Sequence, residues 1–373
     1  MAKPLVKYLV LSLPNYINSE KWLEEYFNGD RSGLINFNVP DFKIGTLDSL
    51  IQESEELSRW DKQLGTSVEK ITEILDSVSD VSGTRKVDGK EVRNYIKSFQ
   101  WNTSKYRLDK AVPELISIIS GEAISTDNDL RTLHQNYQTT RTNFMAADSR
   151  RNGDLSVRLL HEIVKPEQFV LDSEYLVTVL VAVPKNLVSD FEKSYESLTE
   201  FVIPRSAQVI ATDKEYRLYT VTLFKKYYQE FINRAREHKW QPRTDFTYSE
   251  EALNNMRKEF DLSKANEVKL RNDLIRLAMT AYSDVFASWV HIKSIRVYVE
   301  SVLRYGLPPH FTCTLIKFEG PGLKNFAKTK KDIFAKFQYL GGDSQINSSS
   351  LHQYASLVDT EYEPFVFYEL EVL

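Results

Sequence analysis

Residues 247–305 decide the fold and read TYSEEALNNMRKEFDLSKANEVKLRNDLIRLAMTAYSDVFASWVHIKSIRVYVESVLRY. The stretch contains no glycine and no proline, Thr247 and Glu250 have the spacing of a capping box, and Gly-Leu-Pro-Pro at 306–309 is a stop signal. These features predict one helix. It would be roughly 85–90 Å long at 1.5 Å per residue, whereas a compact globule of this chain length has a radius of gyration of about 21 Å. We therefore expect an elongated molecule.

Helical patterns on the N-terminal side of this stretch supply its packing partners. Residues 113–119 and 126–151 are helical in pattern, and Asn152-Gly153 closes the second segment. We expect the 126–151 helix to leave one body and the 247–305 helix to return as its antiparallel partner. A small domain near residues 165–246 would cap the far end.

A further helix starting near Thr46 carries one good apolar seam and one interrupted seam. Stepping by seven along the good seam gives Leu50, Leu57, Leu64, Ile71 and Val78. The companion series is apolar only at its ends and consists of Leu47, Ser54, Asp61, Val68 and Leu75.

The sequence pattern changes from about Val164, where strand patterns appear between helical ones. Residues 177–183 form a continuous β-branched run that is typical of a buried strand. Two alternating strands are expected at 207–211 and 216–223, helices at 186–199 and 225–239, and a short extended piece near Phe246. The resulting β-α-β-β-α-β order is the split βαβ arrangement of a small ferredoxin-like domain.

The sequence patterns at both chain ends predict strands, and we expect the N-terminal and C-terminal strands to pair in one body. Residues 8–13 form the first strand, residues 311–318 and 364–373 form later ones, and residues 324–337 form a helix. The fold class is therefore α+β, an elongated two-body molecule with long antiparallel connecting helices. The expected parts are residues 1–155 (one body with its outgoing helix), 160–246 (the small domain), 247–305 (the long helix) and 306–373 (the rest of the first body).

Composition places the 373-residue chain among folded proteins of a reducing compartment, with the cytosol as the default. Hydrophobic residues make up 42% and charged residues 27%, which is ordinary globular usage. The net charge of -4 argues against a surface built to neutralise phosphates. Cys313 is the only cysteine, which excludes an internal disulfide and a cysteine-based zinc site. The longest apolar stretch, residues 176–183, is too short for a bilayer span.

No enzymatic motif is present, so we predict no catalytic, metal-binding or cofactor-binding residue. Glycine-rich phosphate loops and a nucleophile elbow lack a candidate, and His161-Glu162 begins like a zinc-binding pair but Lys165 replaces the second histidine. The scattered histidines and Cys313 are interpreted as structural or, for the histidines, exposed. The carboxylates Asp359, Glu361 and Glu363 could bind a metal, but an acidic contact for a basic partner is the favoured interpretation.

Charge is distributed unevenly along the chain. Residues 46–80 hold nine acidic residues against three basic ones, and from residue 337 onward there are six acids and no Lys or Arg. Residues 205–243 hold nine Lys or Arg against four acids. This polarity favours two docking ends of opposite potential. Aromatic residues interleave with the basic ones at 224–231, but their spacing is that of a core-facing helix stripe, so we expect no nucleic-acid partner.

Several longer stretches resemble one known family. They are 41–50 (DFKIGTLDSL), 53–57 (ESEEL), 99–102 (FQWN), 153–158 (GDLSVR), 161–166 (HEIVKP), 175–184, 190–195 (DFEKSY), 291–311 (HIKSIRVYVESVLRYGLPPHF) and 351–365 (LHQYASLVDTEYEPF). In these stretches the chain resembles the C subunits of vacuolar-type proton-translocating ATPases (V-ATPases), most of all the fungal members. Residues 80–91 and 341–350 depart from the family pattern.

The resemblance implies a non-catalytic protein with a foot built from both chain ends, a head from the middle, and long helices between them. It implies that the head grips one peripheral stalk, a heterodimer of the E and G subunits, and that the foot contacts another stalk and the N-terminal domain of the membrane-sector a subunit. It also implies a peripheral place on the cytosolic face of the vacuolar membrane, a role in reversible assembly of the pump, and actin binding in some members.

Candidate interface residues follow from charge and not from a family motif. The head candidates are Arg217, Lys225, Lys226, Arg234 and Arg236. The foot candidates are Glu53, Glu55, Glu56, Asp359, Glu361 and Glu363. The alternative function is a cytoskeletal cross-linker that binds actin at two ends. A hydrolase or nucleotide-binding enzyme would need a convergent site that the sequence does not offer.

Overall fold

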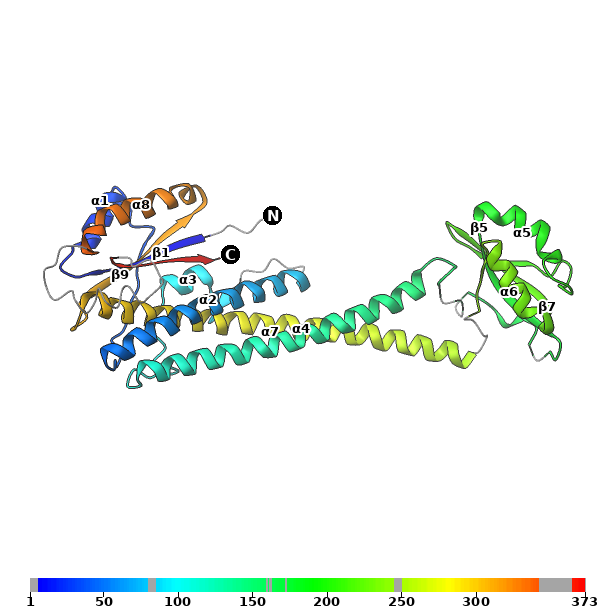
Figure 1. Ribbon diagram of the computed structural model, residues 1–373, viewed down its shortest axis with the longest axis horizontal. Helices are drawn as coiled ribbons and strands as arrows, with labels where there is room; N and C mark the ends of the chain where they lie inside the picture. Colours follow the sequence, from blue (N-terminus) through cyan, green and yellow to red (C-terminus); the bar gives the residue numbers. More distant parts are fainter. Residues whose placement is uncertain are drawn as a thin grey trace. The chain divides into compact units, whose positions relative to one another are not determined.

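The computed structural model describes residues 6–79, 85–158, 160, 163–171, 173–244, 250–341 and 364–372. The fold is α+β, with antiparallel sheets and two long helices, α4 (Val112–Asn152) and α7 (Glu250–Tyr305) (Figure 1). The chain divides into two compact units. Unit 1 comprises Met1–Thr132 and Ile275–Leu373, and unit 2 comprises Leu133–Leu274.

The long helix predicted from residues 247–305 is confirmed as α7, one uninterrupted helix of 56 residues. It ends at Gly306, whose φ of +81° is a left-handed stop that glycine adopts without a steric penalty. The predicted capping residue Thr247 lies outside the described residues. The segments predicted at 113–119 and 126–151 form the single helix α4, because burial of Ile119 and Ala123 outweighs the ~1 kcal/mol cost of Gly121 in a helix.

The sheet of unit 1 joins the two ends of the chain, as the sequence predicts. Its strands lie in the order β10 (Val366–Val372), β1 (Val6–Pro14), β9 (Phe311–Glu319), β2 (Leu34–Asn36), and neighbours are antiparallel. Val10 of β1 lies between Tyr368 and Leu315 of its two neighbours. Figure 1 shows the first and last strands side by side.

Alternate residues of β1 face different layers. Leu9, Leu11 and Leu13 pack in a core with side chains of α1 (Ser19–Tyr26) and α8 (Phe326–Phe337). On the other face, the Ser12 hydroxyl lies 2.8 Å from that of Ser301 on α7. The sheet is therefore covered on both faces.

Helix α2 (Leu47–Val78) presents its apolar seam to the interior of unit 1. The predicted good seam is confirmed, because every member is buried: Leu50, Leu57, Leu64, Ile71 and Val78. Short elements complete this unit: β3 (Lys86–Val87), β4 (Lys90–Glu91) and α3 (Val92–Lys97).

Unit 2 contains the predicted β-α-β-β-α-β order. Its elements are β5 (Leu176–Pro184), α5 (Val188–Ser194), β6 (Gln208–Thr212), β7 (Tyr216–Phe224), α6 (Tyr228–Glu237) and β8 (Gln241–Pro242). The strands lie in the order β6-β7-β5-β8 with antiparallel neighbours, which is the split βαβ arrangement.

Short 3₁₀ turns occur in both units. They lie at Pro166–Gln168, Lys185–Leu187, Tyr195–Ser197, Lys225–Tyr227, Gly320–Asn325 and Gln338–Gly341.

Both faces of the unit 2 sheet are covered, which explains the continuous apolar run of β5. Val181 and its neighbours on one face pack against Phe191 of α5 and Phe231 of α6. Leu180 on the other face packs in a second cluster with Leu155. Phe231 is buried in the first cluster, and Tyr227 and Tyr228 are partly buried against it, so the core-packing interpretation of the aromatic stripe is confirmed for these three residues.

The seam of α2 generates a test of the core. We expect Leu57→Ala to lower the free energy of unfolding by about 2–5 kcal/mol, because it leaves a cavity where a fully buried side chain packs. The control is Leu262→Ala on α7, where the side chain is exposed and the change should stay within about 0.5 kcal/mol. Urea unfolding followed by circular dichroism measures both, and equal midpoints would contradict the expectation.

Candidate functional site

The predicted basic set lies on β7 and at α6 in unit 2, and three of its members have partners within the chain. Arg217 lies 3.7 Å from Glu192. Arg234 lies 2.7 Å from Glu230 and donates to the Leu198 carbonyl at 2.7 Å. The ammonium group of Lys225 donates to the Ser173 carbonyl at 2.6 Å.

The remaining two cations are more available. Lys226 and Arg236 are exposed, and neither lies in ion-pair distance of a carboxylate within the described part of the chain. The ammonium group of Lys226 lies over the Tyr227 ring, 5.4 Å from its centroid. Glu192 of α5, which lies outside the sequence count, thus neutralises part of the positive charge assigned to residues 205–243.

The predicted acidic set does not form one described surface. Glu55 is exposed on α2, whereas Glu56 is half-buried and accepts a hydrogen bond from Trp60 Nε1 at 3.1 Å. The predicted contact at Asp359, Glu361 and Glu363 lies outside the described residues.

Glu53 is buried, with only 4% of its surface exposed, and is therefore not available to a partner in this conformation. Neither of its carboxyl oxygens has a hydrogen-bond partner among the described residues. Burial, with a smaller contribution from the nearby charge of Glu56, raises the pKa of Glu53. Of the three candidates on α2, only Glu55 and Glu56 have side chains at the surface.

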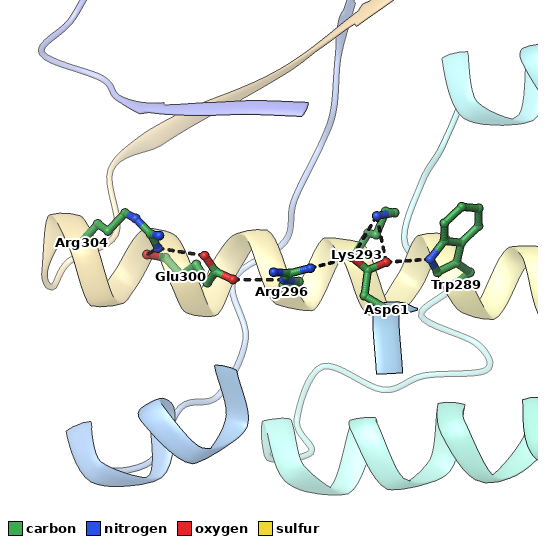
Figure 2. A network of polar contacts seen from close by, with 6 residues as sticks. All are labelled: Asp61, Trp289, Lys293, Arg296, Glu300 and Arg304. Carbon is green, nitrogen blue, oxygen red and sulfur yellow. Dashed lines mark hydrogen bonds and ion pairs between the residues drawn. The ribbon is translucent and has the colours of Figure 1, made fainter. Parts of the chain in front are cut away.

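A buried network of charges joins α2 to α7 in unit 1 (Figure 2). Asp61 accepts from Trp289 Nε1 at 2.6 Å, from Lys293 Nζ at 2.8 Å and from Arg296 Nη1 at 2.7 Å. Arg296 Nε donates to Glu300 at 3.0 Å, and Arg304 lies 2.8 Å from the second oxygen of Glu300. All of the charged groups that Asp61 contacts therefore come from one helix, α7.

The network is electrostatically coupled. Burial raises the pKa of Asp61, but the charges of Lys293 and Arg296 outweigh it and hold that pKa below its ordinary value. Burial lowers the pKa of Lys293, although Asp61 opposes this. The arrangement fixes how α2 lies against α7, and it offers no nucleophile or general base to a substrate.

In the sequence, Asp61 stands out only as an interruption of a seam. The signal that could have found its role was a carboxylate at a seam position together with Lys293 and Arg296, which are three residues apart on another helix. Because the pairing joins residues more than 200 positions apart, periodicity within α2 could not reveal the partner.

His291 is a structural histidine, as expected. Its ring packs against those of Phe99, Trp101 and Tyr106 with centroids 4.9–5.1 Å apart. Nε2 accepts from the Asn102 backbone N–H at 3.2 Å, so Nδ1 carries the proton and donates to the Ala287 carbonyl at 2.7 Å. Burial lowers the pKa of His291 from 6.5 to about 4.

The described residues provide no catalytic constellation. Cys313 is buried, and burial raises the pKa of its thiol, which confirms the inert interpretation. A polar cavity of about 300 Å³ in unit 1 is lined by Lys105, Glu122 and Asp284, among others, but Lys105 and Glu122 already pair at 2.9 Å. Within the described ranges, no group of three or more His, Cys, Asp or Glu side chains could hold a metal ion. Over the same ranges, no helix has the length and apolar character needed to cross a bilayer.

The chain matches the family model described as the C subunit of the V-ATPase over residues 8–366. It is 50% identical to the C subunit of the V-type proton ATPase of Saccharomyces cerevisiae, covering 97% of this chain and 96% of that protein. It is 36% identical to the C 1-A subunit of the V-type proton ATPase of Danio rerio, covering 90% and 88%.

The chain therefore belongs to the V-ATPase C subunit family, whose members are non-catalytic components of the V1 sector of a machine for proton transport. Among solved structures, the cytoplasmic N-terminal domain of the V-ATPase I subunit, a homologue of the a subunit, aligns with 88% of this chain and 97% of that chain. Its TM-score of 0.29 and identity of 13% are too low to bear on the fold.

The buried network generates a stability test. We expect Asp61→Asn to lower the free energy of unfolding by about 3–5 kcal/mol, because Lys293 and Arg296 lose the charge that compensates their burial. Adding Lys293→Met to Asp61→Asn should restore part of the loss, since one unpaired buried charge is then removed. Glu55→Gln, on the exposed side of the same helix, serves as the control. A urea midpoint for Asp61→Asn equal to that of the control would show that the network is dispensable.

His291 generates a pH test. The unfolded chain takes up a proton near pH 6.5 but the folded chain only near pH 4, so stability falls as the pH drops through this window. The expected contribution at pH 5 is a loss of about 2 kcal/mol relative to pH 7. His291→Gln should flatten this part of the stability profile, whereas His310→Gln, at an exposed histidine, should leave it unchanged. Identical slopes for all three proteins in denaturation at pH 5–7 would contradict this origin.

Proposed function

We propose that this chain is a stator component of a vacuolar proton-pumping ATPase and bridges the pump's peripheral stalks to its membrane sector. The observation that supports this proposal is the family match over residues 8–366 together with 50% identity to the yeast protein. The task of such a component is mechanical, because rotary ATP hydrolysis produces torque that something must resist.

In this proposal, the domain of residues 160–246 is the head and binds a stalk made of the E and G subunits. Residues 1–155 and 306–373 form the foot, which binds a second stalk and the N-terminal domain of the membrane-sector a subunit. The joining of β1 and β10 in one sheet supports a foot built from both chain ends. The proposed place of the chain is peripheral, on the cytosolic face of the vacuolar membrane.

The same arrangement suits reversible assembly. Two sites on one chain hold a complex by avidity, and the overall affinity falls steeply once either site lets go. Release of this chain would then separate the cytosolic and membrane sectors of the pump without any covalent change.

Calorimetric titration of purified E–G heterodimer into the full chain tests the proposal. We expect saturable binding that weakens as salt is raised, because the exposed cations of the head contribute. Arg236→Glu should weaken binding several-fold at low salt, since Arg236 is exposed and lacks an ion pair within the described residues. The matched control is Lys214→Glu, an exposed cation of the turn between β6 and β7, which should leave the affinity within about twofold. No binding by the wild-type chain to a folded stalk would overturn the proposal.

A further inference from the structure

Exposed and half-buried apolar side chains gather at one end of the unit 2 sheet, where β5 begins and β7 ends. Leu176 and Phe224 face each other there as the terminal residues of the two strands. Phe201 and Tyr175 lie beside this pair and are 60% and 64% exposed, respectively. The nearby Leu171 is also half exposed. Apolar side chains exposed together in this way commonly mark an interaction site.

Phe201 is held in a conformation that its side chain disfavours. Its φ of +60° lies in the left-handed region, which is a genuine outlier for a bulky residue. The flanking backbone enforces it: the Phe201 carbonyl accepts from the Phe224 N–H at 3.3 Å, and the Ile203 N–H donates to the Thr222 carbonyl at 2.9 Å. The exposed position of the Phe201 ring therefore carries a backbone conformational cost of about 1–3 kcal/mol.

The exposed ring forms part of a small aromatic platform. Phe201 stacks on Tyr227 at 5.4 Å with an interplanar angle of 26° and contacts Phe224 edge-on at 5.7 Å. The Tyr227 hydroxyl donates to Glu200 at 3.3 Å, which fixes the second ring. Rigid aromatic side chains of this kind give large contact area at low entropic cost and dominate binding hot spots.

Charged groups border the platform in a defined pattern. Lys225 and Lys226 follow Phe224 directly, and neither ammonium group has a carboxylate within ion-pair distance in the described part of the chain. Two carboxylates also lie at this corner. Glu200 accepts a hydrogen bond from the Tyr227 hydroxyl, and Glu174 is exposed next to Tyr175. The two lysines are therefore the cations at this corner that an acidic partner residue would complement.

We propose that the corner made by Tyr175, Phe201, Phe224 and Tyr227 is the hot spot through which unit 2 binds an amphipathic helix. The helix would place apolar side chains on the rings and an acidic residue against Lys225 and Lys226. The proposal rests on the proposed function, which supplies the E–G stalk as the occupant, and it assigns the main affinity to aromatic contacts in place of the basic set.

The position of the corner favours a helix over an added strand. Beside the rings, the edge of β7 is already occupied by the backbone of residues 201–203, which exchanges hydrogen bonds with Thr222 and Phe224, so a partner strand could not pair with β7 there. Recognition must then rely on side chains. A helix satisfies its own backbone hydrogen bonds and presents side chains at i, i+3 and i+4 on one face, which suits such a platform.

The test measures binding of purified E–G heterodimer to the full chain by calorimetry. We expect Phe201→Gly to raise Kd at least about tenfold. Glycine suits the left-handed φ, so this variant should fold at least as stably as the wild type. Phe201→Tyr keeps the ring and should keep the affinity within about twofold. Leu262→Ala removes an equally exposed apolar side chain elsewhere in unit 2 and should also leave Kd unchanged.

A second variant tests the charged border. Lys226→Glu should raise Kd several-fold at low salt, and the difference should shrink as salt is added. Wild-type binding with an unchanged Kd for Phe201→Gly would overturn the hot spot but leave the proposed function standing. No wild-type binding to a folded stalk would overturn both. If Phe201→Gly instead abolished binding to vesicles of anionic phospholipid while stalk affinity stayed constant, the corner would belong to a membrane surface and the proposal would be wrong.

Discussion

The contact between Asp61 of α2 and the Lys293–Arg296 pair of α7 is the constraint on which unit 1 depends. Three donors converge on one buried carboxylate, so a shift of α2 along α7 by one turn would leave charges unpaired in the core. The apolar seam of α2 supplies most of the burial but is repetitive, and repeated leucines alone would tolerate several registers. A charged position within such a seam selects one of them.

Once α7 is fixed in this way, it positions the other layers of unit 1. Tyr305 near its end donates to the Ser12 carbonyl of β1 at 2.6 Å, and Ser301 contacts Ser12. The sheet that joins both chain ends is thereby anchored to the same helix that carries the charge network. His291, between Trp289 and Lys293 on α7, ties the 99–106 segment to this helix through aromatic packing and a hydrogen bond from Asn102. Both chain ends are thus connected directly to α7.

Unit 2 shows why counting charges along a sequence is an incomplete guide to an interface. The excess of cations over residues 205–243 is real, yet Arg217 pairs with Glu192 of α5 and Arg234 pairs with Glu230 of its own helix. Phe201, in contrast, is exposed, has a positive φ and stacks on Tyr227. The proposed hot spot therefore relies on aromatic contact and on the exposed Lys226 more than on net charge, because paired surface charges contribute little.

The sequence by itself determined the elements whose signals are local: the uninterrupted α7, the good seam of α2, the terminal strands and the β-α-β-β-α-β order of unit 2. Each follows from periodicity, from the absence of helix breakers, or from turn residues. Family membership also came from long continuous stretches. Only the tertiary structure decided that Asp61 is a network centre, that Glu53 is buried and that Phe201 is exposed with a positive φ. These properties depend on residues far apart in the chain, and a one-dimensional pattern does not record which distant side chain satisfies a charge.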